Sequence, residues 1–187
     1  MEELPKYLLK SEAKKLKVVV GRSGNSRDIA IFELLLTYGP RASEIGLLKL
    51  SDINVDEKTI VIPRLKHGKI NVWPMLSNFE FAVTEWLKER NSVTEWVFPG
   101  SKLKGLSRKR IWELMRKYGG VAGLPKEKQH PHACRHYAAV NALDAGLEIV
   151  DVQDLLGHSA ITSTMIYAQI TSKRRNQAAQ KLEKFND

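Results

Sequence analysis

The chain has 187 residues, and its 30 lysines and arginines exceed its 21 aspartates and glutamates, giving a formal net charge of +9. This length suits one domain. A hydrophobic content of 43% with 27% charged residues excludes disorder as the main state. A single cysteine, Cys134, excludes an intramolecular disulfide framework, and no apolar run is long enough for a membrane span or a signal peptide. The basic balance makes a polyanion the first partner to consider, and the cytoplasm the expected compartment.

Apolar residues recur mostly at helical spacing, so the chain is predicted to be mainly α-helical. Ser11 and Ser26 are predicted N-caps, and the stretch GRSGNS between the two helices is predicted to be a loop. The pair Gly39-Pro40 ends the helix that Ser26 begins, and Gly119-Gly120 ends a later basic helix. Helices are predicted over residues 12–20, 26–38, a short stretch from 41, 77–90, 107–118, 131–145, 149–156, 162–168 and 172–185.

A small antiparallel hairpin interrupts these helices. The β-branched run at 59–62 is closed by Pro63, and a second extended run at 70–73 follows the polar stretch His67-Gly68-Lys69. A brief extended segment is also predicted at 96–98. With no repeat or linker, residues 1–187 are expected to form one α+β domain, mainly α, with an N-terminal extension (1–6) and a C-terminal helix (172–187).

Positive charge is concentrated between Ser101 and Lys117. This segment carries one acid, Glu113, against seven basic residues: Lys102, Lys104, Arg108, Lys109, Arg110, Arg116 and Lys117. A one-sided basic patch suits a phosphate backbone, which is bound by charge and counterion release. The alternative is an ordinary solvated helix face.

Five further places carry side chains suited to phosphate chemistry, although each alone has an ordinary structural explanation. An arginine at a helix start is well placed to hold an anion, and a lysine at a hairpin tip is able to reach a partner. A histidine and an arginine three residues apart lie on one helix face. In chain order the residues are Arg41, Lys66, the pair His132 and Arg135, His158 after a helix-ending glycine, and Tyr167.

Other catalytic chemistries have little support in the sequence. His130, His132 and His136 have no carboxylate or second cysteine at ligand spacing, so no metal site is expected. The phosphate-binding loop pattern G-x-x-x-x-G-K-[ST] is also missing from the sequence, which leaves a nucleotide mechanism unsupported.

Order and spacing of these residues resemble the tyrosine recombinase (phage integrase) family over about residues 7–175. The matching stretches are GPRASEI at 39–45, LKHGK at 65–69, HACRH at 132–136, LLGHS at 155–159 and Tyr167. The resemblance implies a helical catalytic domain in which Tyr167 is the nucleophile. It further implies that the other catalytic residues are Arg41, Lys66, His132, Arg135 and His158. The basic residues expected to contact DNA are Lys69, Lys102, Lys104, Arg108, Lys109 and Arg110.

The resemblance also implies what the protein does. It predicts a site-specific recombinase that cleaves and rejoins DNA through a 3′-phosphotyrosyl intermediate, without ATP, metal or another cofactor. The expected partners are double-stranded DNA with a specific recombination site and accessory DNA-bending proteins, with no membrane. The protein is expected to be a monomer when free and a homotetramer on DNA at the nucleoid, with the C-terminal helix exchanged between subunits.

The sequence departs from the family pattern in three ways. Many relatives have an arginine where this chain has Asn71, and Lys69 competes with Lys66 for the hairpin-lysine role; the distance to Pro74 favours Lys66. The N-terminal DNA-clamping domain of most integrases is not expected here. The chain is either an excised catalytic domain or one of the short members that resemble fimbrial invertases, and its beginning at Met1 favours the second.

Three rival functions remain open at this stage. A type IB topoisomerase shares the chemistry but reseals one duplex, and the full H-x-x-R-H and L-L-G-H signature favours the recombinase. A non-catalytic DNA-binding regulator would not need every catalytic position filled. A basic RNA-binding protein would leave the coincidence of the six residues unexplained.

Overall fold

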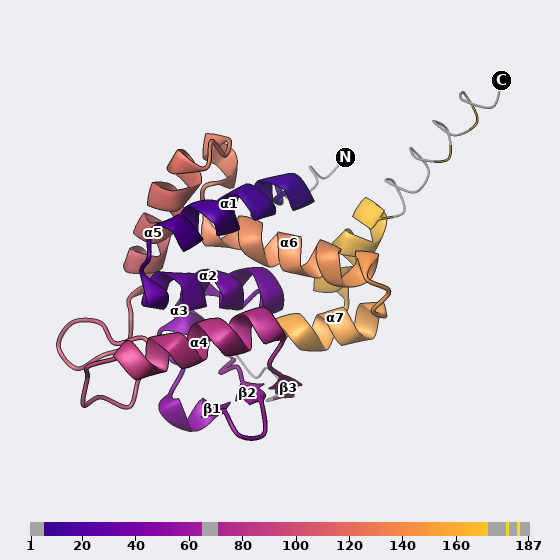
Figure 1. Cartoon of the computed structure of the whole chain (residues 1–187). Coiled ribbons are helices and arrows are strands. Elements are labelled where there is room, and N and C mark those ends of the chain that lie inside the picture. Colours follow the sequence, from indigo (N-terminus) through magenta and orange to yellow (C-terminus); the bar gives the residue numbers. More distant parts are fainter. Residues whose placement is uncertain (1–5, 65–70, 172–178, 180–182, 184–187) are drawn as a thin grey trace.

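Helix α2 (Ser26–Tyr38) lies at the centre of the computed structural model, which describes residues 6–64, 71–171, 179 and 183. Its sequence is apolar nearly all round, as expected for a helix buried on every side. It packs against α1 (Lys10–Arg22), α4 (Ser77–Glu89) and α6 (Pro131–Asp144). Figure 1 shows α2 between α1 and α6 on one side and α4 on the other.

The remaining helices surround this centre. Helix α5 (Arg108–Val121) lies against α1, α3 and α6, and α7 (Ile149–Leu156) packs on α6. The hydroxyl of Tyr118 on α5 donates a 2.7 Å hydrogen bond to the buried carboxylate of Asp28 on α2. The short elements are α3 (Ala42–Ile45) and the 3-10 turns η1 (Leu50–Asp52) and η2 (Lys126–Lys128). Residues 162–171 form a further helix.

A three-stranded antiparallel sheet stands at one end of the molecule (Figure 1). The strands run in the order β1 (Ile53–Asn54), β2 (Thr59–Val61) and β3 (Val72–Pro74), and Ile60 pairs with both Ile53 and Trp73. The predicted hairpin is therefore confirmed, although its tip, residues 65–70, lies outside the described residues. Strand β1 was not predicted, because two residues are too few to form a periodic pattern.

The main differences from the predicted elements are at helix ends. Helix α1 begins at Lys10 rather than Glu12, because the Glu12 carboxylate accepts the backbone N–H of Leu9 at 2.7 Å. The N-cap of α2 is Asn25, not Ser26, since its side chain accepts the N–H of Asp28. A capping side chain and a neighbouring serine are hard to tell apart without the geometry.

The predicted stop at Gly119-Gly120 was also wrong, because α5 continues through both glycines to Val121. Gly119 is buried, and a Cβ on it would lie 3.2 Å from the side chain of Gln129. Close packing therefore accounts for this glycine. The chain leaves the helix at Gly123, which has φ +69.

Two further sequence expectations concern extended structure and membranes. Residues 96–98 form no regular strand; they contribute an isolated bridge between Lys49 and Trp96, and Val97 and Phe98 are fully buried. None of the helices in the described ranges is both long and apolar enough to cross a bilayer.

Candidate active site

Four of the predicted residues, Arg41, Arg135, His158 and Tyr167, come together from segments far apart in the chain. Arg41 is the N-cap of α3, Arg135 lies on α6, His158 follows α7, and Tyr167 lies on the helix of residues 162–171. The charges of Arg41 and Arg135 both act on Tyr167 and on His158. The structure thus gathers two guanidinium groups, an imidazole and a phenol in one place.

Arg135 is the central group of this site. Its side chain is buried, with the residue only 3% exposed. Nη1 donates to the carbonyl oxygen of Gly39 at 2.7 Å, and Nη2 donates to that of Leu156 at 2.9 Å. These bonds fix the two loops that precede Arg41 and His158. Burial and the nearby charge of Arg41 lower the pKa of Arg135 to about 10, so the group is still a cation at neutral pH.

One carboxylate, Glu44, holds two arginines beside Arg135. Arg41 Nη1 donates to Oε1 at 2.7 Å, and Arg64 Nη1 donates to Oε2 at 3.1 Å. Burial would raise the pKa of Glu44, but hydrogen bonds from Arg41 and the charge of Arg64 outweigh it and hold the pKa below its usual range. Three guanidinium groups therefore face the carboxylate of Glu44, which leaves an excess of positive charge among the described residues of the site, suited to an anion.

Arg64 links the sheet to the loop that carries His158. It follows β2, its side chain is 2% exposed, and Nη2 also donates to the carbonyl oxygen of Leu155. Gly157 ends α7 with φ +64, and a Cβ there would lie 2.6 Å from the Arg64 side chain. The glycine before His158 is thus required both for the left-handed turn and for the close approach of Arg64.

His158 is oriented by a buried threonine. Its Nδ1 lies 2.9 Å from Oγ1 of Thr164, which is fully buried. Burial, together with the charges of Arg135 and Arg41, lowers the pKa of His158 to about 4. The imidazole is therefore neutral at pH 7, and in the tautomer whose Nδ1 accepts from the Thr164 hydroxyl, Nε2 carries the hydrogen and is a donor.

Tyr167 is 2% exposed, and its hydroxyl is hydrogen-bonded to Nδ1 of His136 at 2.8 Å. Burial raises the pKa of Tyr167, and the charges of Arg135 and Arg41 offset part of that rise. The phenol is therefore protonated in the free protein. Its reaction as a nucleophile requires removal of the proton.

A row of aromatic rings connects α5 to Tyr167. Trp112 stacks on His130 with ring centroids 5.9 Å apart, and His130, His132 and His136 follow at 6.4 and 6.3 Å. His136 then lies 5.7 Å from the ring of Tyr167. His132 lies at the surface of this row, and burial together with the charge of Arg135 lowers its pKa. The assignment of His132 as a catalytic residue stays a prediction.

The predicted DNA-contacting residues fall into two groups. Lys69, like the predicted catalytic residue Lys66, lies outside the described residues. The remainder are exposed: Lys102 and Lys104 in the loop before α5, and Arg108, Lys109 and Arg110 in its first turn. Arg108 is near enough to His132 for its charge to lower the pKa of that imidazole. Lys104, Lys109 and Arg110 instead line a shallow depression of about 590 Å³ with Arg27.

Sequence reasoning assigned no role to four residues of the site. Glu44 and His136 are within matched motifs, and the i, i+3 spacing of Arg41 and Glu44 was a signal for the first of them. Arg64 and Thr164 gave no signal, because their contacts are to segments far away along the chain or depend on a particular loop geometry.

Comparison with known proteins identifies the architecture that holds these residues. The model of the phage integrase family matches residues 6–174. This chain belongs to the phage integrase family. Its fold, mainly helical with a small antiparallel sheet, is also that of the crystal structure of XerA recombinase, with a TM-score of 0.81 at 27% identity over 96% of this chain and 64% of that one.

Curated relatives of this integrase-family chain include site-specific recombinases. Tyrosine recombinase XerA of Pyrococcus horikoshii is 34% identical over 96% of this chain and 62% of its own length. Type 1 fimbriae regulatory protein FimB of Escherichia coli K12 is 36% identical over 80% of this chain and 76% of its own length. The chain thus spans less than two thirds of the length of XerA. A structure of XerH recombinase bound to its difH substrate, 23% identical with a TM-score of 0.78, shares the fold.

Proposed function

We propose that this chain is the catalytic domain of a tyrosine-type site-specific DNA recombinase, in which Tyr167 is the nucleophile. The observation that carries the proposal is the convergence of Arg41, Arg135 and His158 on Tyr167. Arg135 is buried, and among the described residues of the site the guanidinium groups outnumber the carboxylate of Glu44, so the site suits a phosphodiester. The relatives named as tyrosine recombinases support the same activity.

In the proposed reaction the hydroxyl of Tyr167 attacks the phosphorus of a DNA phosphodiester. The P–Oη bond forms, the bond to the 5′ oxygen breaks, and the bond energy is retained in a 3′-phosphotyrosyl link, so ATP is not needed. A second DNA end bearing a 5′-hydroxyl reverses the step. Because strands from two duplexes are exchanged, this reaction differs from the resealing of one duplex by a type IB topoisomerase.

Each predicted catalytic residue has a distinct task in this reaction. Arg41 and Arg135 donate forked hydrogen bonds to the non-bridging oxygens, on which negative charge grows, and neutral His158 adds an Nε2 donor. Lys66 is the proposed general acid for the 5′ oxygen, a poor leaving group without a proton. His132 orients the phosphate at the open end of the site. Forming the Tyr167 phenolate in advance would cost about 4 kcal/mol at pH 7, so proton removal must accompany attack.

The described DNA contacts of this proposal are basic residues in the first turn of α5 and in the loop before it. Arg108, beside His132, is placed to bind the phosphates next to the scissile one, and Lys102, Lys104, Lys109 and Arg110 extend the positive surface. Such contacts position DNA through charge and carry no sequence information. The proposed partner is double-stranded DNA at the nucleoid, with a specific recombination site and DNA-bending proteins setting the outcome.

The chemistry predicts that cleavage survives removal of divalent metals, since arginine, lysine and histidine supply all the positive charge. The protein is incubated with duplexes tiled across its own genomic locus in EDTA, and the nicked strand is tested with polynucleotide kinase. We expect direct labelling of a free 5′-hydroxyl, without phosphatase treatment. A metal requirement, or a 5′-phosphate at the nick, would contradict the mechanism.

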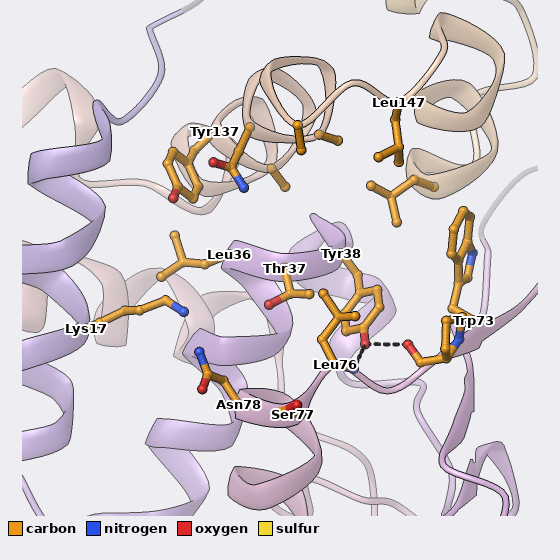
Figure 2. Close-up of a pocket in the computed structure, with 16 residues that line it drawn as sticks. Lys17, Leu36, Thr37, Tyr38, Trp73, Leu76, Ser77, Asn78, Tyr137 and Leu147 are labelled. Carbon is orange, nitrogen blue, oxygen red and sulfur yellow. Dashed lines mark hydrogen bonds between the residues drawn. The ribbon is translucent and has the colours of Figure 1, made fainter.

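A pocket of about 550 Å³ between α2, α4, α6 and β3 supports an assembly on DNA (Figure 2). Apolar side chains line it, among them Leu36, Trp73, Leu76, Leu147 and Leu155. The indole Nε1 of Trp73 is buried and has no hydrogen-bond partner within the described residues. Figure 2 shows the Tyr38 hydroxyl at the pocket floor, where it donates to the carbonyl oxygen of Pro74 and accepts the N–H of Leu76.

The proposed occupant of this pocket is the C-terminal segment 172–185 of a neighbouring subunit. In a helix, Ala178, Leu182 and Phe185 would form an apolar stripe at i, i+4 and i+7, which suits an apolar groove. Exchange of this segment around a ring would join four subunits on DNA, and the free chain would be a monomer.

Deletion of residues 173–187 is expected to weaken assembly on DNA, because the pocket loses its occupant. Light scattering and band-shift titration measure the size of the oligomer on DNA. The variant Leu76→Glu, which places a charge in the pocket, should weaken assembly in the same way. Binding of a single subunit to DNA should change little. Unchanged assembly in both variants would mean that the segment packs within its own subunit.

A further inference from the structure

The hydroxyl of Tyr167 is in contact with a histidine that the reaction as described so far does not use. His136 follows Arg135 on α6, and its Nδ1 lies 2.8 Å from Tyr167 Oη. The two rings are tilted by 51° with centroids 5.7 Å apart. This contact joins positions 31 residues apart in the sequence and involves the atom that would attack phosphorus.

This hydrogen bond joins a neutral imidazole to a neutral phenol, and the tautomer of His136 sets its direction. Burial, and then the charges of His132, Arg135 and His130, lower the pKa of His136 to about 4, so the imidazole is neutral. Burial also keeps Tyr167 protonated, since its pKa is raised. A neutral imidazole has one nitrogen that accepts and one that donates. With Nδ1 as the accepting nitrogen, the Tyr167 O–H donates to it and Nε2 of His136 carries the ring hydrogen, which is the tautomer that the reaction requires.

We propose that His136 is the general base that takes the proton of Tyr167 as the phenol attacks DNA, an inference that rests on the proposed function. The P–Oη bond forms while the hydroxyl proton moves to Nδ1, and the imidazole becomes an imidazolium with hydrogens on both nitrogens. The 5′ oxygen departs with a proton from Lys66. In the reverse step His136 returns its proton to the tyrosine oxygen as that oxygen leaves phosphorus.

His132 is the other histidine of the H-x-x-R-H motif, but the geometry favours His136 as the base. In the row of rings, His132 lies between His130 and His136, with its ring centroid 6.3 Å from that of His136. His136, in contrast, is hydrogen-bonded to Tyr167. A general base has to be within hydrogen-bond reach of the proton it abstracts. His136 satisfies this requirement in the free protein.

Bound DNA would make His136 a stronger base than it is in the free protein. The titratable and charged groups that act on or contact it are His130 at the N-cap of α6, His132 and Arg135 on α6, His158 after α7, and Tyr167. The cationic Arg135 disfavours a second positive charge. A phosphodiester beside Arg135 introduces negative charge, which offsets this repulsion and favours the imidazolium. Proton transfer from Tyr167 is thus coupled to the arrival of the substrate.

The test is single-turnover cleavage of the duplex on which the wild-type protein forms its covalent adduct, with His136→Asn as the main variant. The Asn amide oxygen is able to take the place of Nδ1 as a hydrogen-bond acceptor but does not take up a proton. We expect a loss of about 10²–10⁴-fold in rate at pH 7, the usual contribution of general base catalysis. His130→Asn is the matched control, because His130 caps α6 and asparagine is a good N-cap; its rate should remain within a few-fold of wild type.

The pH dependence separates a base from a structural residue. Without a base, attack requires a phenolate formed in advance, so the rate of His136→Asn should rise about tenfold per pH unit toward the pKa of Tyr167, which burial raises. The wild-type rate should level off once His136 is unprotonated in the DNA complex. A residue that only shapes the site would lower the rate equally at every pH.

A substrate with sulfur at the 5′-bridging position identifies which proton transfer is lost. The thiolate leaves without a proton, so this substrate should restore cleavage by Lys66→Ala but not by His136→Asn. The base role of His136 would be overturned, with the proposed function intact, if the sulfur substrate rescued His136→Asn. The same would hold if His136→Asn cleaved ordinary DNA at the wild-type rate. Absence of any adduct with the wild-type protein would instead overturn the proposed function, and the base role with it.

Discussion

Replacement of Arg135 by alanine is expected to reduce DNA cleavage by at least about 10²–10³-fold while the protein stays folded. Loss of one pre-aimed donor to the reacting oxygens has an effect of this size in other enzymes. Here the same change also frees the carbonyl oxygens of Gly39 and Leu156, which precede the loops of Arg41 and His158. Single-turnover cleavage measures the effect, and circular dichroism checks the fold.

Arg135→Lys is the informative companion to this variant. Lysine keeps the charge, but its compact ammonium group does not reproduce a planar fork that bonds to two carbonyl oxygens and a phosphate together. We therefore expect a strong defect in Arg135→Lys as well. Cleavage by Arg135→Ala within tenfold of the wild-type rate would show that this guanidinium does not contact the reacting phosphate.

Replacement of Glu44 by glutamine is expected to lower the free energy of unfolding by about 3–5 kcal/mol at pH 7. Removal of one partner from a buried ion pair leaves the other charges uncompensated. Glu44 is fully buried, and its loss leaves Arg41 and Arg64 without their shared carboxylate. Urea unfolding measures the change. Glu113→Gln, which breaks an exposed ion pair with Arg110, is the control and should change stability by less than about 1 kcal/mol.

The effect of Glu44→Gln should also depend on pH in a defined direction. Because its folded-state pKa is lowered, the carboxylate stabilises the fold fully above its unfolded-state pKa of about 4.3. This contribution is lost as the pH falls through the folded-state pKa. The difference between wild type and Glu44→Gln should therefore shrink below about pH 4. An equal difference at pH 7 and in acid would contradict the ion-pair explanation.

The sequence was sufficient to predict the helices and the hairpin, because apolar spacing and capping residues are local signals. The sequence was less reliable at the ends of the helices. Gly119 predicts a helix stop, but it lies within α5, where the close approach of Gln129 accounts for a glycine; this is a tertiary contact that leaves no local signal. Strand β1 is only two residues long and depends on pairing with β2 rather than on a pattern of its own.

For the candidate site, the sequence predicted the residues of the motifs but not the residues that hold them in place. Arg41, Arg135, His158 and Tyr167 were selected by motif and spacing, and the structure brings them together. The residues that hold or partner them depend on three-dimensional contacts. The bond of Arg64 to the carbonyl oxygen of Leu155 spans 91 residues and leaves no pattern in one sequence.

The most direct test of the central claim is a denaturing gel of the protein after incubation in EDTA with DNA from its own locus, beside Tyr167→Phe. Phenylalanine retains the buried ring but has no hydroxyl to attack phosphorus. The account predicts a slow-migrating, protease-sensitive DNA adduct with the wild-type protein and none with Tyr167→Phe. An adduct that persists in Tyr167→Phe would mean that another residue is the nucleophile. Tight, salt-sensitive binding without any adduct would contradict a catalytic function.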